Sequence, residues 1–373
     1  AVTPAVMFAF QSGLAELWRA RGVRPDIVLG HSFGEVTAAY LAGGIGNATV
    51  AKLVTHRGLI RGHVDRVGAM AAIGLGAKTI APLLPTDGSI EIGGYNSPQM
   101  VTLTGEEKAI DALIQQLNDD DPTILTRKLA LDFAYHSSWF EPVEHIFKAE
   151  VGELETAPPN LRVISTVTGN LNVRFDADYW WQNLRYPVRY QQAVERALEL
   201  GADTFIELGP HRTLSSMTAA CAAAKGRTVA TVSTLDKRWG DLVSVAVATG
   251  QLYVSGVEID WSVIHGTGGR DISLPRQPWV LTELWSEPEE ASRIMHPPTA
   301  HALLGRREPA PTPNWSNEVS LTTHSYLGDH RLDGECVFAA AAYVDMLTAA
   351  AREVLGCEAI ELVDVTFPAA LYI

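Results

Sequence analysis

Near the N-terminus, stretches in which apolar residues have helical spacing stand before and after a short strand-like apolar run. Residues 5–21 carry apolar side chains at helical spacing, and Gly22 ends that stretch. The apolar run 27–29 is typical of a short buried strand, and helical patterns follow at 34–42 and 48–63. A strand set between helices predicts an α/β core.

From residue 68 the order of the predicted elements changes. Short apolar strands and two helices follow one another as β-α-β-β-α-β, the order of a ferredoxin-like fold. The predicted strands lie at 69–76, within 89–105 and at 124–133, and the second helix lies at 106–117. We therefore expect a ferredoxin-like insert over 68–131, which divides the core into residues 1–67 and 132–236.

Helical and strand-like patterns resume in the second part of the core. They predict strands at 162–169, 204–210 and 228–233, helices within 179–201 and a helix at 239–255. Residues 260–298, with their glycines, prolines and tryptophans, predict an ordered linker that packs on its neighbours. We assign 237–295 to a helix and linker, and 296–373, with one strong helix at 339–355, to a last domain.

Composition and charge narrow the class of protein. The 373 residues are 47% apolar and 19% charged, which is typical of a globular protein. The formal net charge of −14 argues against nucleic acid and anionic membranes as partners, and no apolar run is long enough to span a membrane. Cys221, Cys336 and Cys357 form no CxxC pair, so we expect no zinc site and a cytoplasmic location. Asp119–Asp121 is expected to be a solvated loop rather than a metal site.

Both ends of the sequence suggest a segment of a longer polypeptide. The chain has no initiator Met and opens inside a predicted helix, and it stops in a strand-like run at 367–373. The first residues carry no charged region ahead of the apolar stretch, so a signal peptide is not expected.

Gly30-His31-Ser32-Phe33-Gly34 matches the nucleophile elbow G-x-S-x-G, with a strand before it and a helix after it. In this context Ser32 is predicted to be a nucleophile, and the N–H of Phe33 at the helix start is a natural oxyanion donor. His31 is expected to pack beneath the serine.

A serine nucleophile needs a base, and the chain has 11 histidines. His136 follows a predicted strand and precedes a predicted helix, a position where catalytic groups collect. Spacing alone does not select it from the others.

Six sequence blocks resemble the acyltransferase domain of type I polyketide synthases, which is related to the malonyl-CoA:acyl-carrier-protein transacylases. They occur in the family's order over about residues 1–236: GHSFGEVTAAYLAGG, HRGLI, GGYNSPQMVTLTG, FAYHSSWFEPV, YWWQNLRYPVRY and FIELGPHRTL. The resemblance implies a Ser–His dyad of Ser32 and His136. It also implies that a backbone carbonyl, at Asn183, orients the histidine in place of a carboxylate.

The resemblance further implies residues that bind the substrate. Arg57 matches the family's arginine for the free carboxylate of malonyl, a role that suits a guanidinium because it forms two parallel hydrogen bonds. Asn96 is expected to shape the cleft beside the insert, with a plain turn role equally open. Phe33, Phe133 and Tyr135 occupy positions that distinguish malonyl-selective from methylmalonyl-selective members, and Phe-Ala-Tyr-His is a hybrid of the two patterns. The family's Gly-Gln-Gly segment, whose glutamine gives a second oxyanion contact, is absent from this sequence.

The residues after the linker resemble the start of a polyketide synthase dehydratase, which has a double hot-dog fold. The segments HALLGRRE and HSYLGDH carry this likeness, whereas LPRQPW, earlier in the chain, resembles the Leu-Pro-x-x-Pro-Trp stretch that follows these acyltransferases. The family's HxxxGxxxxP motif maps onto His330 and Gly334, but Ala339 stands at the proline position. The resemblance implies that His330 is the base of a partial dehydratase site.

Together these features predict an α/β, hydrolase-like acyltransferase core with a ferredoxin-like insert, followed by a partial hot-dog (α+β) domain. The expected reaction loads an acyl group, malonyl in the first place, from CoA onto Ser32 and passes it to the phosphopantetheine thiol of an acyl carrier protein. No cofactor or metal is expected in this segment, and the expected partners are the carrier protein and other domains of the same synthase.

Two other functions stay open at this point. An α/β-hydrolase such as a thioesterase shares the serine elbow, and it would need an acid ahead of a late histidine but no Arg57. A truncated, non-catalytic scaffold segment is the other alternative.

Overall fold

The computed structural model describes residues 2–171, 174–269, 272–282 and 301–373, together with 284, 286, 288, 291, 295 and 299. The chain forms two compact units, residues 1–271 (unit 1) and 272–373 (unit 2). No helix in the described parts of the chain is both long and apolar enough to cross a membrane.

The core of unit 1 is built on two pairs of short parallel strands. β1 (Ile27–Leu29) pairs with β6 (Arg162–Ile164), and β7 (Thr204–Glu207) pairs with β8 (Ala230–Ser233). Parallel strands require crossover connections, which helices supply here. The helices of the core are α1 (Val2–Ala20), α2 (Gly34–Leu41), α3 (Asn47–Leu59), α6 (Glu144–Val151), α7 (Ala177–Arg185), α8 (Tyr190–Glu199), α9 (Ser215–Ala224), α10 (Asp241–Val254) and α11 (Trp261–His265). Two 3-10 turns, η1 (Ile60–His63) and η3 (Ser138–Val143), complete it.

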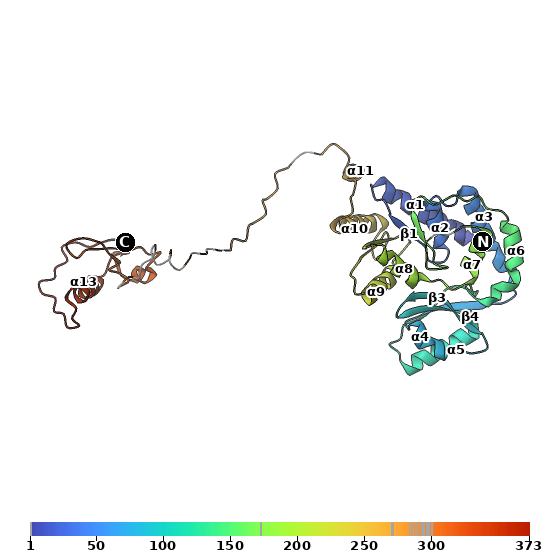
Figure 1. Cartoon of the computed structure of the whole chain (residues 1–373), viewed down its shortest axis with the longest axis horizontal. Helices are drawn as coiled ribbons and strands as arrows, with labels where there is room; N and C mark the ends of the chain where they lie inside the picture. The colour runs from blue at the N-terminus through green and yellow to red at the C-terminus, as the bar shows by residue number, and fades with distance from the viewer. Residues whose placement is uncertain are drawn as a thin grey trace. The chain divides into compact units, whose positions relative to one another are not determined.

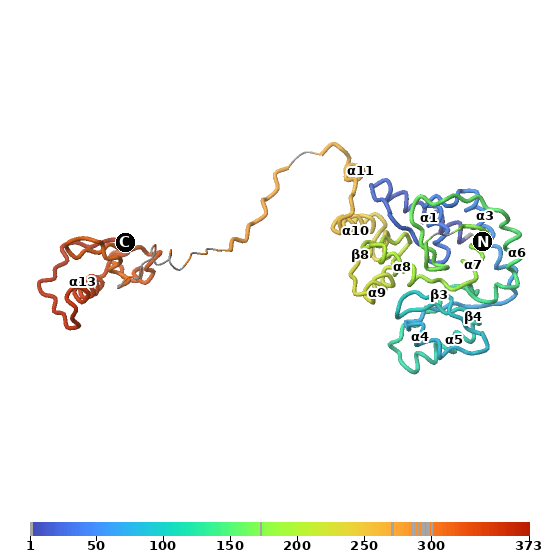
Figure 2. The backbone as a smooth tube through the Cα atoms, viewed as in Figure 1, coloured from blue at the N-terminus to red at the C-terminus, as the bar shows by residue number. Residues whose placement is uncertain are grey.

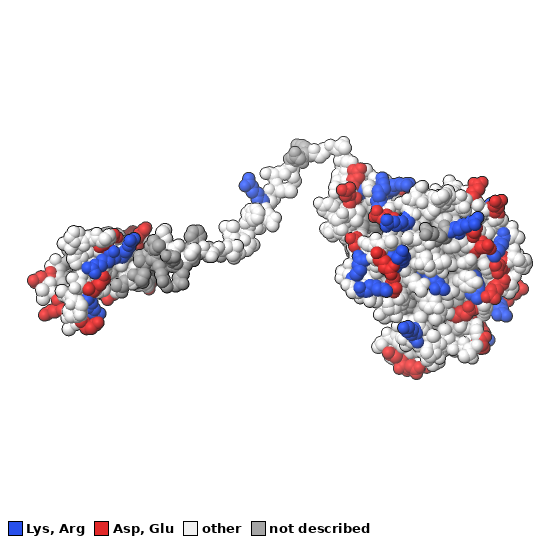
Figure 3. Space-filling view, viewed as in Figure 1, with Lys and Arg blue, Asp and Glu red and all other residues white. Residues whose placement is uncertain are grey.

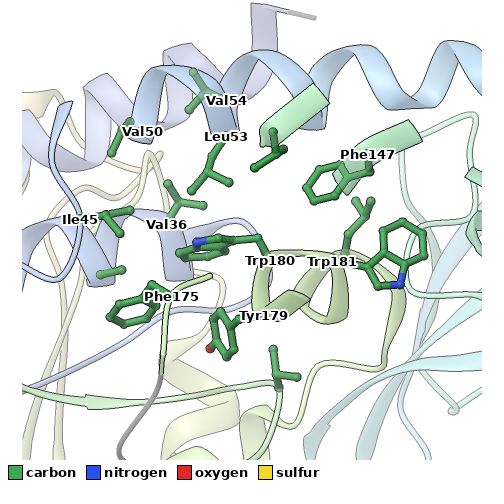
Figure 4. Packing of buried hydrophobic residues seen from close by; sticks show 14 of the residues in the cluster. Val36, Ile45, Val50, Leu53, Val54, Phe147, Phe175, Tyr179, Trp180 and Trp181 are labelled. Carbon is green, nitrogen blue, oxygen red and sulfur yellow. The ribbon is translucent and has the colours of Figure 1, made fainter. Parts of the chain in front are cut away.

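The largest apolar cluster lies among α2, α3, α6 and α7 (Figure 4). Trp180 and Trp181 on α7 face Leu53 of α3 and Phe147 of α6, and Trp180 is only 1% exposed. These aromatic side chains and the aliphatic side chains around them therefore exclude water from the space between the helices, and hold α2 and α3 in place.

The predicted insert forms a separate four-stranded antiparallel sheet in the order β3-β4-β2-β5. Its elements are β2 (Gly68–Ile73), α4 (Ala77–Ile80), η2 (Ala81–Leu83), β3 (Ile90–Ser97), β4 (Met100–Glu106), α5 (Glu107–Asp120) and β5 (Thr126–Lys128). Ile110, Leu113 and Leu117 line one face of α5 at helical spacing and pack on this sheet. The β-α-β-β-α-β order and this strand order are those of a ferredoxin-like fold, as the sequence predicts. Figure 1 shows α4 and α5 on the same side of β3 and β4.

The insert is joined to the core by main-chain hydrogen bonds as well as by its connections. Figure 2 shows the insert as the cyan part of the trace, between the blue and green parts of the core. The N–H of Tyr95 on β3 donates to the carbonyl of Val188 at 2.8 Å, and the N–H of Val188 donates to the carbonyl of Gly93 at 3.0 Å. The edge of the insert's sheet is thus paired with the segment between α7 and α8.

Some helices and strands predicted from the sequence end at other residues in the structure. The predicted strand 27–29 is found residue for residue, whereas the helix predicted at 48–63 ends as α3 at Leu59 and continues as a 3-10 turn. The strand predicted at 124–133 is shorter, because only β5 pairs with β2 before the chain leaves the sheet. His136 therefore lies in a loop rather than at a strand end, and that sequence interpretation is wrong.

The region after the core divides into a packed part and an exposed part. Leu252 on α10, together with Val257 and Ile259, packs in one cluster with Trp18 of α1. The described residues 272–282 form no helix or strand, and their side chains are exposed. The packed residues Leu252, Val257 and Ile259 precede the predicted linker 260–298. The first residue of that linker, Asp260, donates its N–H to the carbonyl of Arg21 at 2.8 Å. Part of the predicted linker, including 289–290, lies outside the described residues. The domain limits drawn from the sequence stay predictions.

Unit 2 combines short antiparallel strand pairs with one long helix. β9 (Arg306–Arg307) pairs with β10 (Trp315–Ser316), and β11 (Arg331–Leu332) pairs with β12 (Glu335–Cys336). A 3-10 turn, η4 (Ser325–Asp329), and α13 (Ala340–Leu355) follow the expected α+β pattern. Leu303, Leu327 and Phe338 form its small core against α13.

Charged side chains of both signs are interspersed on the face of unit 1 that Figure 3 presents. The excess of acidic residues therefore forms no single patch on that face.

Candidate active site

Ser32 stands on a tight turn between β1 and α2. Its φ of 54° lies in the left-handed region, which a non-glycine residue adopts at a cost of about 1–3 kcal/mol. Gly30 makes this turn possible, because a Cβ added there would lie 2.2 Å from the backbone nitrogen of Glu35. The turn places the Ser32 side chain beside the N-terminus of α2. There the N–H of Phe33 has no partner within the helix, as is usual at a helix start.

His136 is hydrogen-bonded to the serine. Its Nε2 lies 2.7 Å from Ser32 Oγ, and its Nδ1 lies 2.9 Å from the carbonyl oxygen of Tyr186. A carbonyl can only accept, so Nδ1 carries the proton and the lone pair of Nε2 faces the serine hydroxyl. Burial first, and then the positive charge of Arg57, lower the pKa of His136 to about 3. The histidine is therefore neutral at physiological pH, as a general base must be.

The expectation that Asn183 supplies the orienting carbonyl is wrong. The carbonyl belongs to Tyr186, the residue after α7, which has left helical conformation with ψ 158°. Its carbonyl consequently turns away from the helix and toward His136.

Arg57 near the end of α3 is buried beside the same serine. Its Nη1 donates to Asn183 Oδ1 at 2.6 Å, and its Nη2 donates to Ser32 Oγ at 3.2 Å. The guanidinium lies 5.8 Å from the ring centre of Phe33 and 5.9 Å from that of Tyr135. Burial lowers the pKa of Arg57 to about 10, so the group keeps its charge at neutral pH.

Phe133 and Tyr135 form one wall next to Arg57. Their rings meet edge to face with centres 4.4 Å apart, and the Tyr135 hydroxyl donates to the Arg57 carbonyl at 3.2 Å. Arg61 lies over the outer face of Phe133 at 4.6 Å. Since Tyr135 also stacks on the buried Phe140, this wall is held by packing from behind.

Asn96 joins the insert to the base of the site. It is 1% exposed, and its Oδ1 lies 2.8 Å from His31 Nε2 while its Nδ2 donates to Thr102. Burial lowers the pKa of His31, so this ring is neutral as well. His31 thus lies behind the serine turn, and Asn96 holds it there.

Two groups at the site were missed by sequence reasoning. The carbonyl of Tyr186 has no sequence signal, because any residue has one. Glu35 does have a signal, since it is the acidic residue that directly follows the G-x-S-x-G elbow on an otherwise apolar helix. In the structure it is fully buried, and its carboxylate accepts from Asn183 Nδ2 at 2.7 Å.

His330 lies in unit 2, between η4 and β11. Its Nδ1 lies 2.8 Å from the carbonyl of Val337, and Nε2 of this exposed residue has no hydrogen-bond partner among the residues that the structure describes. Gly334 sits in the turn between β11 and β12 with φ 87°, a conformation that suits glycine.

The structure therefore brings together Ser32, His136, Arg57 and Asn183, with the aromatic wall beside them. This set supplies a nucleophile, a neutral base and a buried fixed cation, which suits covalent transfer of an acyl group that carries a negative charge. Across the described residues, no three His, Cys, Asp or Glu side chains gather as metal ligands would.

Comparisons with known proteins agree with this chemistry. Residues 1–259 match the family described as acyl transferase domain, and residues 301–373 match the family described as polyketide synthase dehydratase domain. The highly reducing polyketide synthase FUM1 of Gibberella moniliformis is 33% identical over 364 residues, which make up 93% of this chain and 14% of that protein. The phenolphthiocerol synthesis polyketide synthase type I Pks15/1 of Mycobacterium marinum is 30% identical over 379 residues, 98% of this chain and 18% of that protein. The chain thus spans less than a fifth of either protein.

Solved structures give the same result for unit 1. The acyltransferase domain from the second module of the salinomycin polyketide synthase matches with a TM-score of 0.65 and 30% identity, over 73% of this chain and 64% of that chain. The acyltransferase domain of phenolphthiocerol/phthiocerol synthase A from Mycobacterium bovis matches with a TM-score of 0.58 and 31% identity, over 62% of this chain and 89% of that chain.

Proposed function

Because the chain belongs to the acyl transferase domain family of polyketide synthases, we propose that it loads a malonyl extender from CoA onto Ser32 and delivers it to an acyl carrier protein. The observation that carries this proposal is the 2.7 Å contact between Ser32 Oγ and His136 Nε2 beside the buried guanidinium of Arg57.

In the first half-reaction Ser32 Oγ attacks the thioester carbonyl carbon of the acyl-CoA, and His136 Nε2 takes the hydroxyl proton. The carbon–sulfur bond breaks, and His136 returns that proton to the departing CoA thiolate. The N–H of Phe33 faces the developing oxyanion from the helix start. Arg57 Nη2, which already donates to Ser32 Oγ, favours the negative charge that develops on the serine oxygen.

Arg57 also holds the free carboxylate of malonyl. A guanidinium has five N–H donors, and within the described residues its hydrogen bonds go to Asn183 and Ser32, so three donors remain for the substrate. A buried cation that is already aimed at the serine selects an acyl group with a carboxylate near the reacting carbon.

In the second half-reaction the phosphopantetheine thiol of the carrier protein gives its proton to His136 and attacks the acyl-serine ester. Ser32 leaves with a proton from the same histidine. Water would give hydrolysis by the same route, so a thioesterase and a transferase differ only in which acceptor reacts. The aromatic wall of Phe133 and Tyr135 covers the acyl group and disfavours water.

The test is the intact mass of the protein after incubation with malonyl-CoA, followed by addition of a carrier protein that bears phosphopantetheine. One malonyl group should attach at Ser32 and move to the carrier thiol. Ser32→Ala and His136→Ala should each prevent attachment, while the exposed residues Ser262 and His145 provide matched variants, Ser262→Ala and His145→Ala, that should load normally. Adduct on Ser32→Ala would refute the nucleophile, and release of free malonate in place of transfer would favour a thioesterase.

For unit 2 we propose that His330 is the base of a dehydratase site, because its orienting carbonyl leaves Nε2 free to take a proton. The other domains of a synthase are proposed as partners of the chain. A cytoplasmic location also stays a prediction from the sequence.

A further inference from the structure

We propose that Glu35 is a positioning residue that fixes the amide of Asn183, and through it the guanidinium of Arg57, in the orientation that binds a carboxylated acyl group. This inference rests on the proposed function, in which Arg57 holds the malonyl carboxylate. Glu35 lies on α2, one turn after the nucleophile, and its residue is 0% exposed.

Both carboxylate oxygens of Glu35 face hydrogen-bond donors. Oε1 accepts from the N–H of Thr166 at 3.1 Å and from the hydroxyl of Tyr179. Oε2 accepts from Nδ2 of Asn183 at 2.7 Å and lies 2.8 Å from the hydroxyl of Thr166, which lies at the same distance from the carbonyl of Gly30. A buried carboxylate is tolerated only when such partners are present, and these partners come from the chain after β6 and from α7.

Asn183 then stands between one group that only accepts and one that only donates. Its Nδ2 faces the Glu35 carboxylate at 2.7 Å, and its Oδ1 faces Arg57 Nη1 at 2.6 Å. An amide has one donor end and one acceptor end, so only one of its two orientations satisfies both neighbours. Arg57, which can only donate, and Glu35, whose Oε2 accepts, together determine which end of Asn183 meets Arg57.

The orientation of the Asn183 amide matters because the same guanidinium, that of Arg57, contacts both Asn183 and Ser32. Its other terminal nitrogen, Nη2, lies 3.2 Å from Ser32 Oγ, so the two contacts together set the plane of the guanidinium. If the amide of Asn183 were reversed, its NH2 would face the guanidinium. The guanidinium would then lose one of the two hydrogen bonds that fix its plane. A carboxylate bound in bidentate fashion depends on that plane. An acyl group without a carboxylate uses only the contact of Nη2 with Ser32 Oγ, which does not involve Asn183.

Glu35→Gln tests this directly, because the introduced amide has the same shape but can offer a donor to Asn183. We expect kcat/KM for malonyl-CoA loading, measured by intact mass, to fall about ten- to hundredfold, the range typical of one hydrogen bond to a charged group. Loading of acetyl-CoA should change by less than about threefold on the same scale. The readout is thus the malonyl-to-acetyl ratio, which a general loss of folded protein would leave unchanged.

Glu207→Gln is the matched control. The Glu207 carboxylate also accepts from several donors, namely the N–H groups of Thr213, Leu214 and Ser215 and the Ser215 hydroxyl, but it contacts neither Asn183 nor Arg57. This variant should lower the melting temperature and leave the malonyl-to-acetyl ratio as in the parent protein.

A double variant, Glu35→Gln with Asn183→Asp, separates positioning from stability. The introduced carboxylate accepts both from Arg57 and from the introduced amide, so each donor again faces an acceptor. The malonyl-to-acetyl ratio should recover in part, because the contact of Asn183 Nδ2 with the Ser32 carbonyl at 3.3 Å is not restored.

An unchanged ratio in Glu35→Gln, in protein that melts as a folded chain, would overturn the inference. So would a double variant whose ratio is no better than that of Glu35→Gln. Both outcomes leave the proposed function standing as long as the parent protein loads malonyl at Ser32 and Arg57→Ala lowers the ratio. Failure of the parent to load would instead refute the proposed function.

Discussion

Acidic pH should leave acyl loading by this protein almost unchanged, although its proposed base is a histidine. The perturbation is a change of pH from about 8 to about 5.5, which crosses the ordinary histidine pKa of 6.5. The pKa of His136 is lowered to about 3 because the ring is buried, and because Arg57 adds a positive charge beside it. A lowered pKa means that the neutral, base-competent form persists to lower pH.

The size of the effect follows from the two pKa values. With a pKa of 6.5, about one tenth of a histidine is neutral at pH 5.5, and loading would fall about tenfold. With a pKa of about 3, more than nine tenths of His136 is neutral at that pH, and loading should fall by less than about a tenth. The loading rates expected at pH 5.5 for these two pKa values therefore differ by close to a factor of ten.

The assay is the rate of acetyl-CoA loading, read as intact mass over short times between pH 5 and pH 8. Acetyl-CoA is chosen because it has no carboxylate to neutralise Arg57. The Arg57→Ala variant provides the second arm, since removal of the positive charge should raise the pKa of His136 and move any fall in rate to higher pH. A parent profile that falls with a midpoint near 6.5 would refute the reasoning, and would mean that His136 is solvated in the working enzyme.

Three further predictions follow from the same site. Arg57→Ala should lower the malonyl-to-acetyl loading ratio at least about tenfold, because it removes charge-assisted hydrogen bonds to the carboxylate; an unchanged ratio would remove Arg57 from the acyl site. Malonyl-CoA should be preferred over methylmalonyl-CoA by about ten- to a hundredfold in kcat/KM, since a wall of fixed shape rejects one methyl group by about 1–3 kcal/mol. Tyr135→Ser should narrow that preference in a competition assay, and equal loading by the parent protein would contradict the assignment. Gly30→Ala should destabilise the fold by about 1–3 kcal/mol or more, because its Cβ would meet the backbone of Glu35 at 2.2 Å; a melting temperature equal to that of the parent would show that the turn relaxes.

The parts of the site that depend on neighbouring residues could be predicted from the sequence. The serine turn needs a strand, two glycines and a helix within a few residues, and all of them are visible in residues 27–42. The ferredoxin-like insert could be predicted for the same reason, because alternation and helical spacing are local patterns. Ser32, His136 and Arg57 needed the family resemblance as well, since no local pattern links residues 104 and 25 positions apart.

The parts that could not be predicted depend on contacts between distant segments. Glu35 meets Thr166 and Asn183 across 131 and 148 positions, and neither spacing has a sequence signal. The carbonyl that orients His136 was placed three residues too early, because its direction depends on where α7 leaves helical conformation. The strand before His136 was drawn too long, since apolar residues that follow β5 in the sequence continue as a loop rather than in the sheet.

The pairing of β3 with the segment after α7 has a consequence for how such enzymes can diverge. Tyr95 and Gly93 bind Val188 through main-chain atoms, and Val188 follows by two residues the carbonyl that directs His136. Substitutions other than proline exchange side chains but leave N–H and C=O groups in place, so the insert can change those side chains that do not contact the site without altering the main-chain link beside Tyr186. The outer face of the insert, with α4 and α5, can therefore accept other side chains while the main-chain link to the segment that carries the Tyr186 carbonyl stays the same.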